Sequence, residues 1–283
     1  MPGSIRGCAM RLREPRARAW LAALVLGALV LLALFGPAAS PYSYRTLDWR
    51  HLAVPPGFLA QHWLGTDALG RDLYVRTLSG LRLSLLIGVL ATGVSVLIGV
   101  AWGAAAGWAG GRIDDAMMRV VDVLYALPYL FIVLILAALF GRGNIAVLLL
   151  AIGAVGWLTL ARVVRAETLS LKRQAFMEAA RAGGLSGVQM LRRHVLPNLA
   201  GTVAVYATLM VPQMIVYESF LSFLGLGVEP PRASLGSLIN AGARQMLTAP
   251  WLLLVPATVL VLLLLAFNLL GDGLRDVLDP AGR

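Results

Sequence analysis

Charged residues are scarce in this sequence. Only 13% of its residues are Asp, Glu, Lys or Arg, whereas 59% are hydrophobic and the mean hydropathy is +0.80. Soluble domains carry about 25% charged and about 45–50% apolar residues, so the composition excludes an ordinary soluble fold. Apolar surface in this amount needs lipid around it, where helices satisfy their own backbone polar groups. The sequence therefore predicts an all-α integral membrane protein.

Cysteine and histidine are rarer still. The single cysteine, Cys8, excludes an internal disulfide. The three histidines are His51, His62 and His194, and no pair has the sequence spacing of a metal site. We therefore expect no metal site.

Motifs for nucleotide hydrolysis and nucleophilic catalysis are missing. The only lysine, Lys172, follows Leu171 rather than the glycine that a phosphate-binding G-x-x-x-x-G-K-[ST] loop requires. No nucleophile elbow occurs, and ionisable residues within apolar segments are too few for an obvious proton relay. These absences argue against an enzyme and against a proton-coupled carrier, and we expect this chain to hold no cofactor.

Six apolar stretches are long enough to cross a bilayer. They cover residues 19–35, 83–108, 120–140, 145–164, 199–224 and 251–270. The first follows a basic tail, but its length and the lack of a clear A-x-A site favour an uncleaved anchor over a signal peptide. Most of the 24 Arg and Lys residues fall in the tail and the loops on one side, which predicts that both termini are cytoplasmic. The net charge of +10 then reflects membrane orientation and not nucleic-acid binding.

Glycine and proline occur at several positions within these stretches. Small residues allow close helix approach in lipid, so glycines along the second stretch predict helix packing rather than a pore lining. These are Gly88, Gly93, Gly99, Gly103 and Gly107. Pro128 and Pro212 are expected to kink their spans.

The inside segment over residues 165–198 has the clearest local signals. Helix-forming residues precede Gly183 and Gly184, which allow a sharp turn. Ser186 begins a capping-box pattern for a second short helix, and Pro197 suits the first turn of the next span. The pattern predicts a helix, a tight turn and a short helix, able to transmit force from a soluble partner to the spans. An ordinary amphipathic connector is the alternative.

The spacing of this segment resembles the EAA loop of ABC importer permeases. The matching residues are Glu178, Ala179, Ala180, Gly184, Leu196 and Pro197. In that family the loop forms a coupling helix that docks into a groove on the cytoplasmic ATPase, and the resemblance implies this role here. His194 departs from the general pattern, which often has an aliphatic residue at that position, and resembles the peptide-importer branch.

Three further segments resemble the permeases of oligopeptide and dipeptide importers. They are residues 218–227, residues 268–276 and an outside motif made of Gly65, Thr66, Asp67, Gly70, Arg71 and Asp72. The matches cover most of the chain from Gly65 onward, and the nearest resemblance is the C-type permease of oligopeptide importers. Taken singly, the same residue types are also common in helix caps and turns.

Glu218 lies in the outer part of an apolar helix. A carboxylate at the bilayer centre costs roughly 2.5–3.5 kcal/mol on insertion scales, and less near an interface. We therefore expect Glu218 to face protein, a partner subunit or the pathway. One hypothesis is that it helps to shape an outer gate, and the alternative is a hydrogen-bonded structural carboxyl.

The resemblance implies a type I ABC importer permease fold with six transmembrane helices. Its core is expected over residues 82–272, after a basic tail, a first helix and a long outside segment in residues 1–81, and before a cytoplasmic tail in residues 273–283. The implied partners are a second homologous permease, two ABC ATPases that use ATP and Mg, and an extracytoplasmic binding protein. The implied location is a bacterial inner membrane.

The substrate implied by the resemblance is a short peptide, with oligopeptides first. Dipeptides, nickel and glutathione are alternatives within the family. An ion-coupled secondary transporter and a non-transporting scaffold subunit are the alternatives from other classes.

Overall fold

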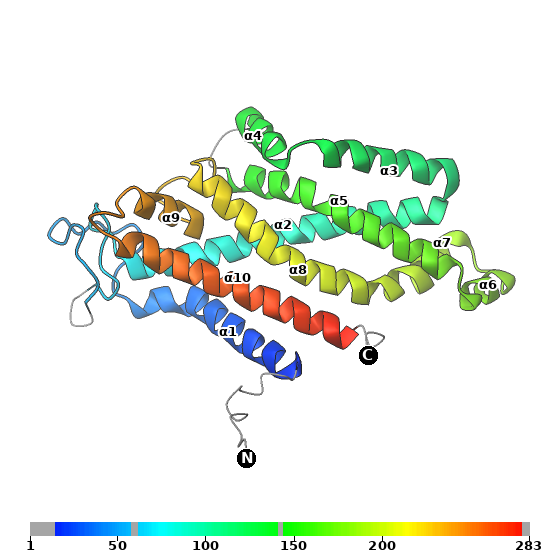
Figure 1. Ribbon diagram of the computed structural model, residues 1–283, viewed down its shortest axis with the longest axis horizontal. Coiled ribbons are helices and arrows are strands. Elements are labelled where there is room, and N and C mark those ends of the chain that lie inside the picture. Colours follow the sequence, from blue (N-terminus) through cyan, green and yellow to red (C-terminus); the bar gives the residue numbers. More distant parts are fainter. Residues whose placement is uncertain (1–14, 58–61, 141–143, 279–283) are drawn as a thin grey trace, which may run out of the picture.

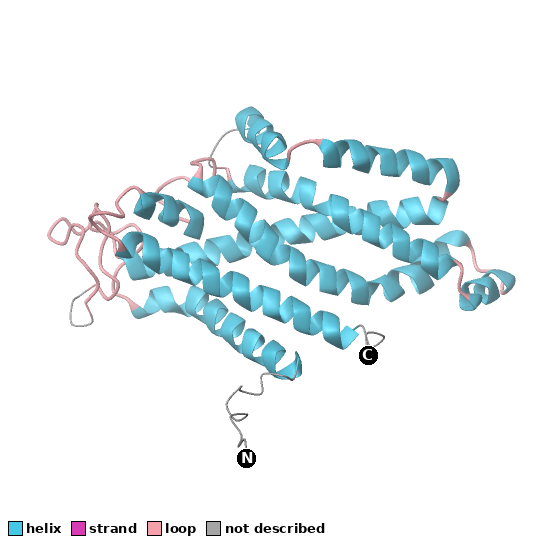
Figure 2. Ribbon diagram, in the orientation of Figure 1, coloured by secondary structure: helices cyan, strands magenta, loops and turns pink. Residues whose placement is uncertain are grey.

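A computed structural model describes residues 15–57, 62–140 and 144–278 of the chain. The described residues form helices and loops, without a named β-strand (Figures 1 and 2). The helices are α1 (Pro15–Phe35), α2 (Leu73–Ala109), α3 (Gly111–Ala126), α4 (Tyr129–Phe140), α5 (Ile145–Lys172), α6 (Ala175–Ala182), α7 (Gly187–Met190), α8 (Leu196–Phe223), α9 (Leu235–Ala243) and α10 (Trp251–Leu278), with a 3-10 turn at Gly36–Ala39 and a π turn at Leu191–Val195. The predicted all-α class is confirmed.

The long helices lie along one axis and leave two distinct ends (Figure 1). One end carries α6, α7 and the junction of α2 with α3. The opposite end carries α9 and the loops between α1 and α2. The two ends of the bundle are called here the coupling end and the loop end. The predicted inside segment and the predicted long outside segment therefore lie at opposite ends.

Within the described residues, five helical stretches are long and apolar enough to cross a membrane. They are Ala19–Ala39, Leu73–Ala109, Ile145–Lys172, Gly187–Phe223 and Trp251–Arg275. The second begins at Leu73 and not near Leu83 as predicted, because the Asp72 carboxylate accepts a hydrogen bond from the Val75 amide and caps the helix there.

The third predicted span, over residues 120–140 with a kink at Pro128, is instead broken into two helices. The chain breaks between α3 and α4, where Leu127 is extended and Pro128 follows. Proline has no amide hydrogen and disfavours a helical conformation in the residue before it. The two helices in series still connect the coupling end to the loop end (Figure 1). Pro212, in contrast, lies inside the unbroken helix α8.

The most extensive helix pairing joins α2 and α5. A Cβ atom on Gly103 would lie 2.4 Å from the Ala161 carbonyl oxygen, and one on Gly107 would lie 2.9 Å from the Arg165 carbonyl oxygen. Gly99 makes a similar close contact with α5, and Gly88 packs on Ile215 of α8. The predicted packing role is confirmed for these four glycines, whereas Gly93 has no atom within 4 Å of such a Cβ.

Helix α9 is the element that the sequence analysis missed. The side chains and backbone amides of Ser234 and Ser237 form a reciprocal capping box at its start. Gly236 then allows the helix to touch the backbone of Ser219 in α8. The capping box was not recognised from the sequence because its third helical position holds a serine in place of the usual Glu or Gln. Helix α9 packs on both α8 and α10.

The close contact of α2 with α5 predicts a contrast between two glycines of one helix. Gly103→Ala forces a methyl group into the Ala161 carbonyl, and overpacking of this kind costs about 1–3 kcal/mol. Gly93→Ala adds a methyl group in open space and is expected to be neutral or mildly stabilising. Thermal unfolding of the two purified variants in one detergent measures the difference. Equal midpoints for both would contradict this account of the packing.

Candidate functional site: the coupling loop and the cavity beside α8

Helix α6 and the turn after it form the first half of the predicted coupling loop. The turn is a Schellman motif, in which the Leu185 amide donates to the Ala180 carbonyl (3.2 Å) and the Gly184 amide donates to the Arg181 carbonyl (3.1 Å). Gly184 has φ +81°, a conformation that residues with a Cβ rarely adopt. The predicted helix and tight turn are confirmed.

Helix α7 begins the second half with the predicted capping box. The Ser186 amide donates to Gln189 Oε1 (2.9 Å), and the Gln189 amide donates to Ser186 Oγ (3.4 Å). This reciprocal pair satisfies amides that would otherwise be free at the helix start.

The sequence analysis expected the second short helix to be separate from the following span. In the structure the two are continuous. Helix α7, the π turn and α8 form one unbroken helical stretch from Gly187 to Phe223. Pro197 lies in the first turn of α8, directly after the π turn, and the Asn198 side chain donates to the His194 carbonyl (2.6 Å). The wider π turn accommodates the missing proline amide without ending the helix. Helices α7 and α8 are therefore continuous with each other.

The coupling loop shows one apolar face to the bundle and one face to solvent. Met177 and Met190 are buried in the main core cluster together with Leu171. The matched residues Glu178, Ala179, Gly184 and Pro197 are exposed, and Ala180 is half-buried. Phe176 and Val188 are also exposed, although both are apolar. The exposed face is thus free to meet a partner while the methionines hold the loop to the spans.

Two polar contacts fix the coupling end of the bundle. Lys172 Nζ donates to the carbonyls of Gly107 (3.1 Å) and Trp108 (2.6 Å) at the end of α2, where a cation suits the helix dipole. Arg165 forms a two-pronged ion pair with Asp114 of α3, at 2.5 and 2.7 Å. Helices α2, α3 and α5 are therefore tied together beside the coupling loop.

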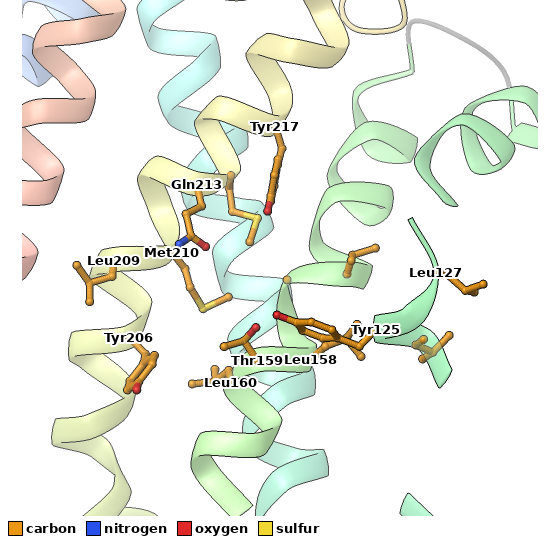
Figure 3. A pocket seen from close by; sticks show the side chains of 14 residues that line it. Tyr125, Leu127, Leu158, Thr159, Leu160, Tyr206, Leu209, Met210, Gln213 and Tyr217 are labelled. Carbon is orange, nitrogen blue, oxygen red and sulfur yellow. The ribbon is translucent and has the colours of Figure 1, made fainter. Parts of the chain in front are cut away.

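A cavity of about 370 Å³ lies between α3, α5 and α8. The side chains of α8 that line it include Tyr206, Met210, Gln213 and Tyr217, all within the helical stretch that begins at α7. Figure 3 shows the Tyr125 hydroxyl, the Gln213 amide and the Tyr217 hydroxyl around the space between α8 and α5. The lining combines apolar walls with a few polar groups, which is typical of a ligand site. The sequence analysis identified none of these residues.

Glu218 faces protein, which is one of the surroundings expected for it. Its carboxylate is fully buried and accepts hydrogen bonds from Ser84 Oγ (2.8 Å), Ser222 Oγ (2.7 Å) and Ser219 Oγ (3.4 Å). Ser84 in turn accepts a hydrogen bond from the Leu235 amide at the start of α9 (3.2 Å). The network joins α2, α8 and α9 near the loop end. The gate hypothesis stays a prediction beside the structural alternative.

The structure brings the six residues of the outside motif together in one compact turn before α2. Asp67 accepts hydrogen bonds from the Leu69 amide, the Arg71 amide and Arg71 Nε, the last at 2.7 Å. The Gly70 backbone, at φ +73°, lies against Asp48, where a Cβ would collide with the carbonyl oxygen. Arg76, which is buried, has Nε 3.6 Å from the Asp67 carboxylate.

The remaining residues of the motif anchor the earlier loop. Gly65 approaches the Val54 carbonyl closely, with φ +79°. The Thr66 hydroxyl donates to the His51 carbonyl and accepts from the Val54 amide. Asp72 caps α2 and pairs with His62, as described below. The residues of the motif therefore do act as turn and cap residues. Their contacts hold residues 48–54 against the start of α2.

Comparison with known proteins identifies the family and the fold of this chain. Residues 74–283 match the family described as binding-protein-dependent transport system inner membrane component. The chain resembles a methionine ABC transporter structure in inward-facing form with a TM-score of 0.56 and 19% identity, over 74% of this chain and 97% of that chain. At that identity the likeness shows the fold alone.

Curated relatives are much more similar in sequence. The oligopeptide transport system permease protein of Haemophilus influenzae is 47% identical over 95% of this chain and 86% of its own length. That of Escherichia coli K12 is 48% identical over 94% and 88%. The dipeptide transport system permease protein of Bacillus subtilis is 44% identical over 89% and 78%.

The family match covers well over half of the chain, and these relatives cover most of it. The predicted family, type I importer fold and transport role are thereby confirmed. The protein therefore belongs to the inner membrane components of binding-protein-dependent transport systems, and it is a permease subunit of an ABC importer rather than an enzyme.

Proposed function

We propose that this permease forms half of the translocation pathway of an importer for short peptides, with oligopeptides as the main substrates. The observation that carries the proposal is the unbroken helical stretch from the exposed coupling loop to the cavity beside α8. The names of the relatives supply the substrate class, which is oligopeptide for those of Haemophilus influenzae and Escherichia coli. The Bacillus subtilis relative supports dipeptides as a second candidate.

The proposed complex contains a second, homologous permease, two ATPase subunits and an extracytoplasmic binding protein. The coupling end faces the cytoplasm, together with both termini, and the loop end faces the binding protein. Several exposed arginines at the coupling end agree with this orientation, namely Arg173, Arg181, Arg192 and Arg193. ATP and Mg are used by the ATPase subunits, so this chain needs no cofactor of its own.

The proposed mechanism is mechanical. Closure of the ATPase pair displaces α6 and the turn at Gly184, and the attached α7 carries the displacement into α8. Because α8 lines the cavity with Tyr206, Gln213 and Tyr217, its displacement changes access to the cavity. Helices α2 and α5 stay together, because their glycine contacts leave no room for sliding.

Reconstitution tests the proposed function against its rivals. The complex is placed in vesicles with its binding protein, a labelled oligopeptide and ATP, and uptake is measured. We expect uptake that requires ATP and the binding protein. Uptake driven by an ion gradient without ATP would favour a secondary transporter, and an intact complex without uptake of any tested peptide would favour a scaffold subunit.

The Schellman turn predicts a contrast between adjacent glycines. Gly184→Val places a branched side chain at φ +81°, which costs at least about 1–2 kcal/mol and distorts the turn. Peptide uptake is expected to fall several-fold, with ATP hydrolysis no longer matched to uptake. Gly183→Ala is the control, because Gly183 has φ −73° and room for a methyl group. Wild-type uptake by Gly184→Val would contradict a coupling role for the turn.

The gate hypothesis for Glu218 predicts a loss of uptake in Glu218→Gln. The amide keeps the shape of the side chain but removes the charge and one acceptor oxygen, and hydrogen bonds to a charged group contribute about 1.5–3 kcal/mol each. Uptake is expected to fall several-fold while the complex assembles normally. The exposed Glu229→Gln serves as the matched control at the same end. Unchanged uptake with normal assembly would leave Glu218 as a purely structural residue.

A further inference from the structure

Two of the three histidines meet an aspartate at the loop end, although the sequence separates them. His51 Nδ1 lies 2.8 Å from Asp48 Oδ2, and His62 Nε2 lies 3.4 Å from the same oxygen. The three atoms lie within 4.8 Å of one another. We call Asp48, His51 and His62 the His–Asp cluster. It lies outside the coupling loop and the cavity, and the proposed transport mechanism does not use it.

A second carboxylate fixes the orientation of His62. Asp72 Oδ2 lies 2.8 Å from His62 Nδ1, and both side chains are buried. The other oxygen of Asp72 accepts a hydrogen bond from the Val75 amide, so this carboxylate acts as an acceptor. The hydrogen-bond network therefore assigns a proton to His62 Nδ1. The Tyr42 ring stacks on the imidazole at 4.2 Å between centroids and restrains it further.

This arrangement leaves a site for a positive ion. With its proton on Nδ1, neutral His62 turns the Nε2 lone pair toward an oxygen of the Asp48 carboxylate, and the two repel each other unless a cation or a second proton lies between them. An imidazole whose other nitrogen donates to a carboxylate is the common arrangement around a protein-bound metal. The His–Asp cluster has this form, with Asp72 as the supporting carboxylate.

We propose that Asp48 Oδ2, His51 Nδ1 and His62 Nε2 bind one zinc-like divalent cation. Zinc bonds of about 2.0–2.1 Å in tetrahedral geometry separate two ligand atoms by roughly 3.4 Å. The distance from Asp48 Oδ2 to His62 Nε2 already has this value, at 3.4 Å. His51 has to move away from Asp48, from its present 2.8 Å. Its side chain is 41% exposed, which allows both this movement and entry of the ion.

The ligand set selects the class of ion. Two imidazoles and one carboxylate suit zinc and its neighbours in the first transition row, whereas calcium and magnesium prefer oxygen ligands alone. The bound ion would join residues 48–51 to His62 and, through Asp72, to the start of α2. It would therefore clamp the segment between α1 and α2 at the face where the proposed orientation places the binding protein.

Zinc binding to the purified complex tests the proposal. The complex is prepared with a tag that contains no histidine, is stripped of metal with a chelator, and is then incubated with zinc and freed of unbound ion. Bound zinc is counted by elemental analysis, and cobalt is used in place of zinc as a spectroscopic probe of tetrahedral coordination. We expect one zinc ion per permease chain to disappear in His51→Gln and in Asp48→Asn. His194→Gln and Cys8→Ser, which change the other histidine and the only cysteine of the chain, are expected to keep it.

Asp72→Asn tests the supporting carboxylate separately. Asparagine caps a helix as well as aspartate does, so α2 is expected to begin normally. The loss of the charge behind His62 is expected to weaken zinc affinity by roughly 10–100-fold.

Three results would overturn the proposal. The first is the absence of the extra zinc ion in the wild-type complex. The second is a zinc content that is unchanged in both His51→Gln and Asp48→Asn, with the complex intact by size-exclusion chromatography. The third is a loss of zinc only in Cys8→Ser or His194→Gln. In the first case a proton on His62, held between two carboxylates, accounts for the cluster. Because His51 is only half-buried, its variant is expected to fold even if changes at buried His62 do not.

Discussion

The continuity of one helical stretch is the constraint on which this account depends. From Gly187 to Phe223 the backbone passes from the solvent-exposed coupling loop to the loop end without a break. A helix transmits displacement along its axis because each turn is hydrogen-bonded to the next. The π turn at Leu191–Val195 lets Pro197 be part of this stretch, although proline usually ends a helix or begins one.

The other helices provide a frame for that movement. Close contacts of Gly99, Gly103 and Gly107 hold the last part of α2 against α5. At the coupling end, Lys172 caps α2, and Arg165 joins α5 to Asp114 of α3. At the loop end, the buried carboxylate of Glu218 connects α8 to α2 and to the start of α9. These glycine contacts and polar pairs make the frame rigid. The exposed face of the coupling loop lies outside the frame.

Much of this architecture could be predicted from sequence because it depends on local chemistry. Apolar length located five of the spans, and turn and capping residues located the Gly184 turn and the Ser186 cap. What the sequence did not reveal depends on tertiary contacts. Examples are the meeting of Asp48 with His62, the lining of the cavity by Tyr125 and Tyr217, and the capping of α2 at Asp72, eleven residues before the apolar stretch predicted from residue 83. Only a kink was expected at Pro128, because the apolar stretch continues through the proline and hydropathy does not reflect its missing amide hydrogen.

Distances between spin labels test most directly whether α7 and α8 move as one body. In a Cys8→Ser background, labels are placed at the exposed residues Val188 on α7, Ala204 on α8 and Leu97 on α2. The Val188–Ala204 separation, about 24 Å for 16 helical residues, is expected to stay constant when the assembled complex binds ATP, while the Ala204–Leu97 distance changes. A change in the first distance with the second unchanged would mean that the stretch bends at the π turn, and it would contradict the account.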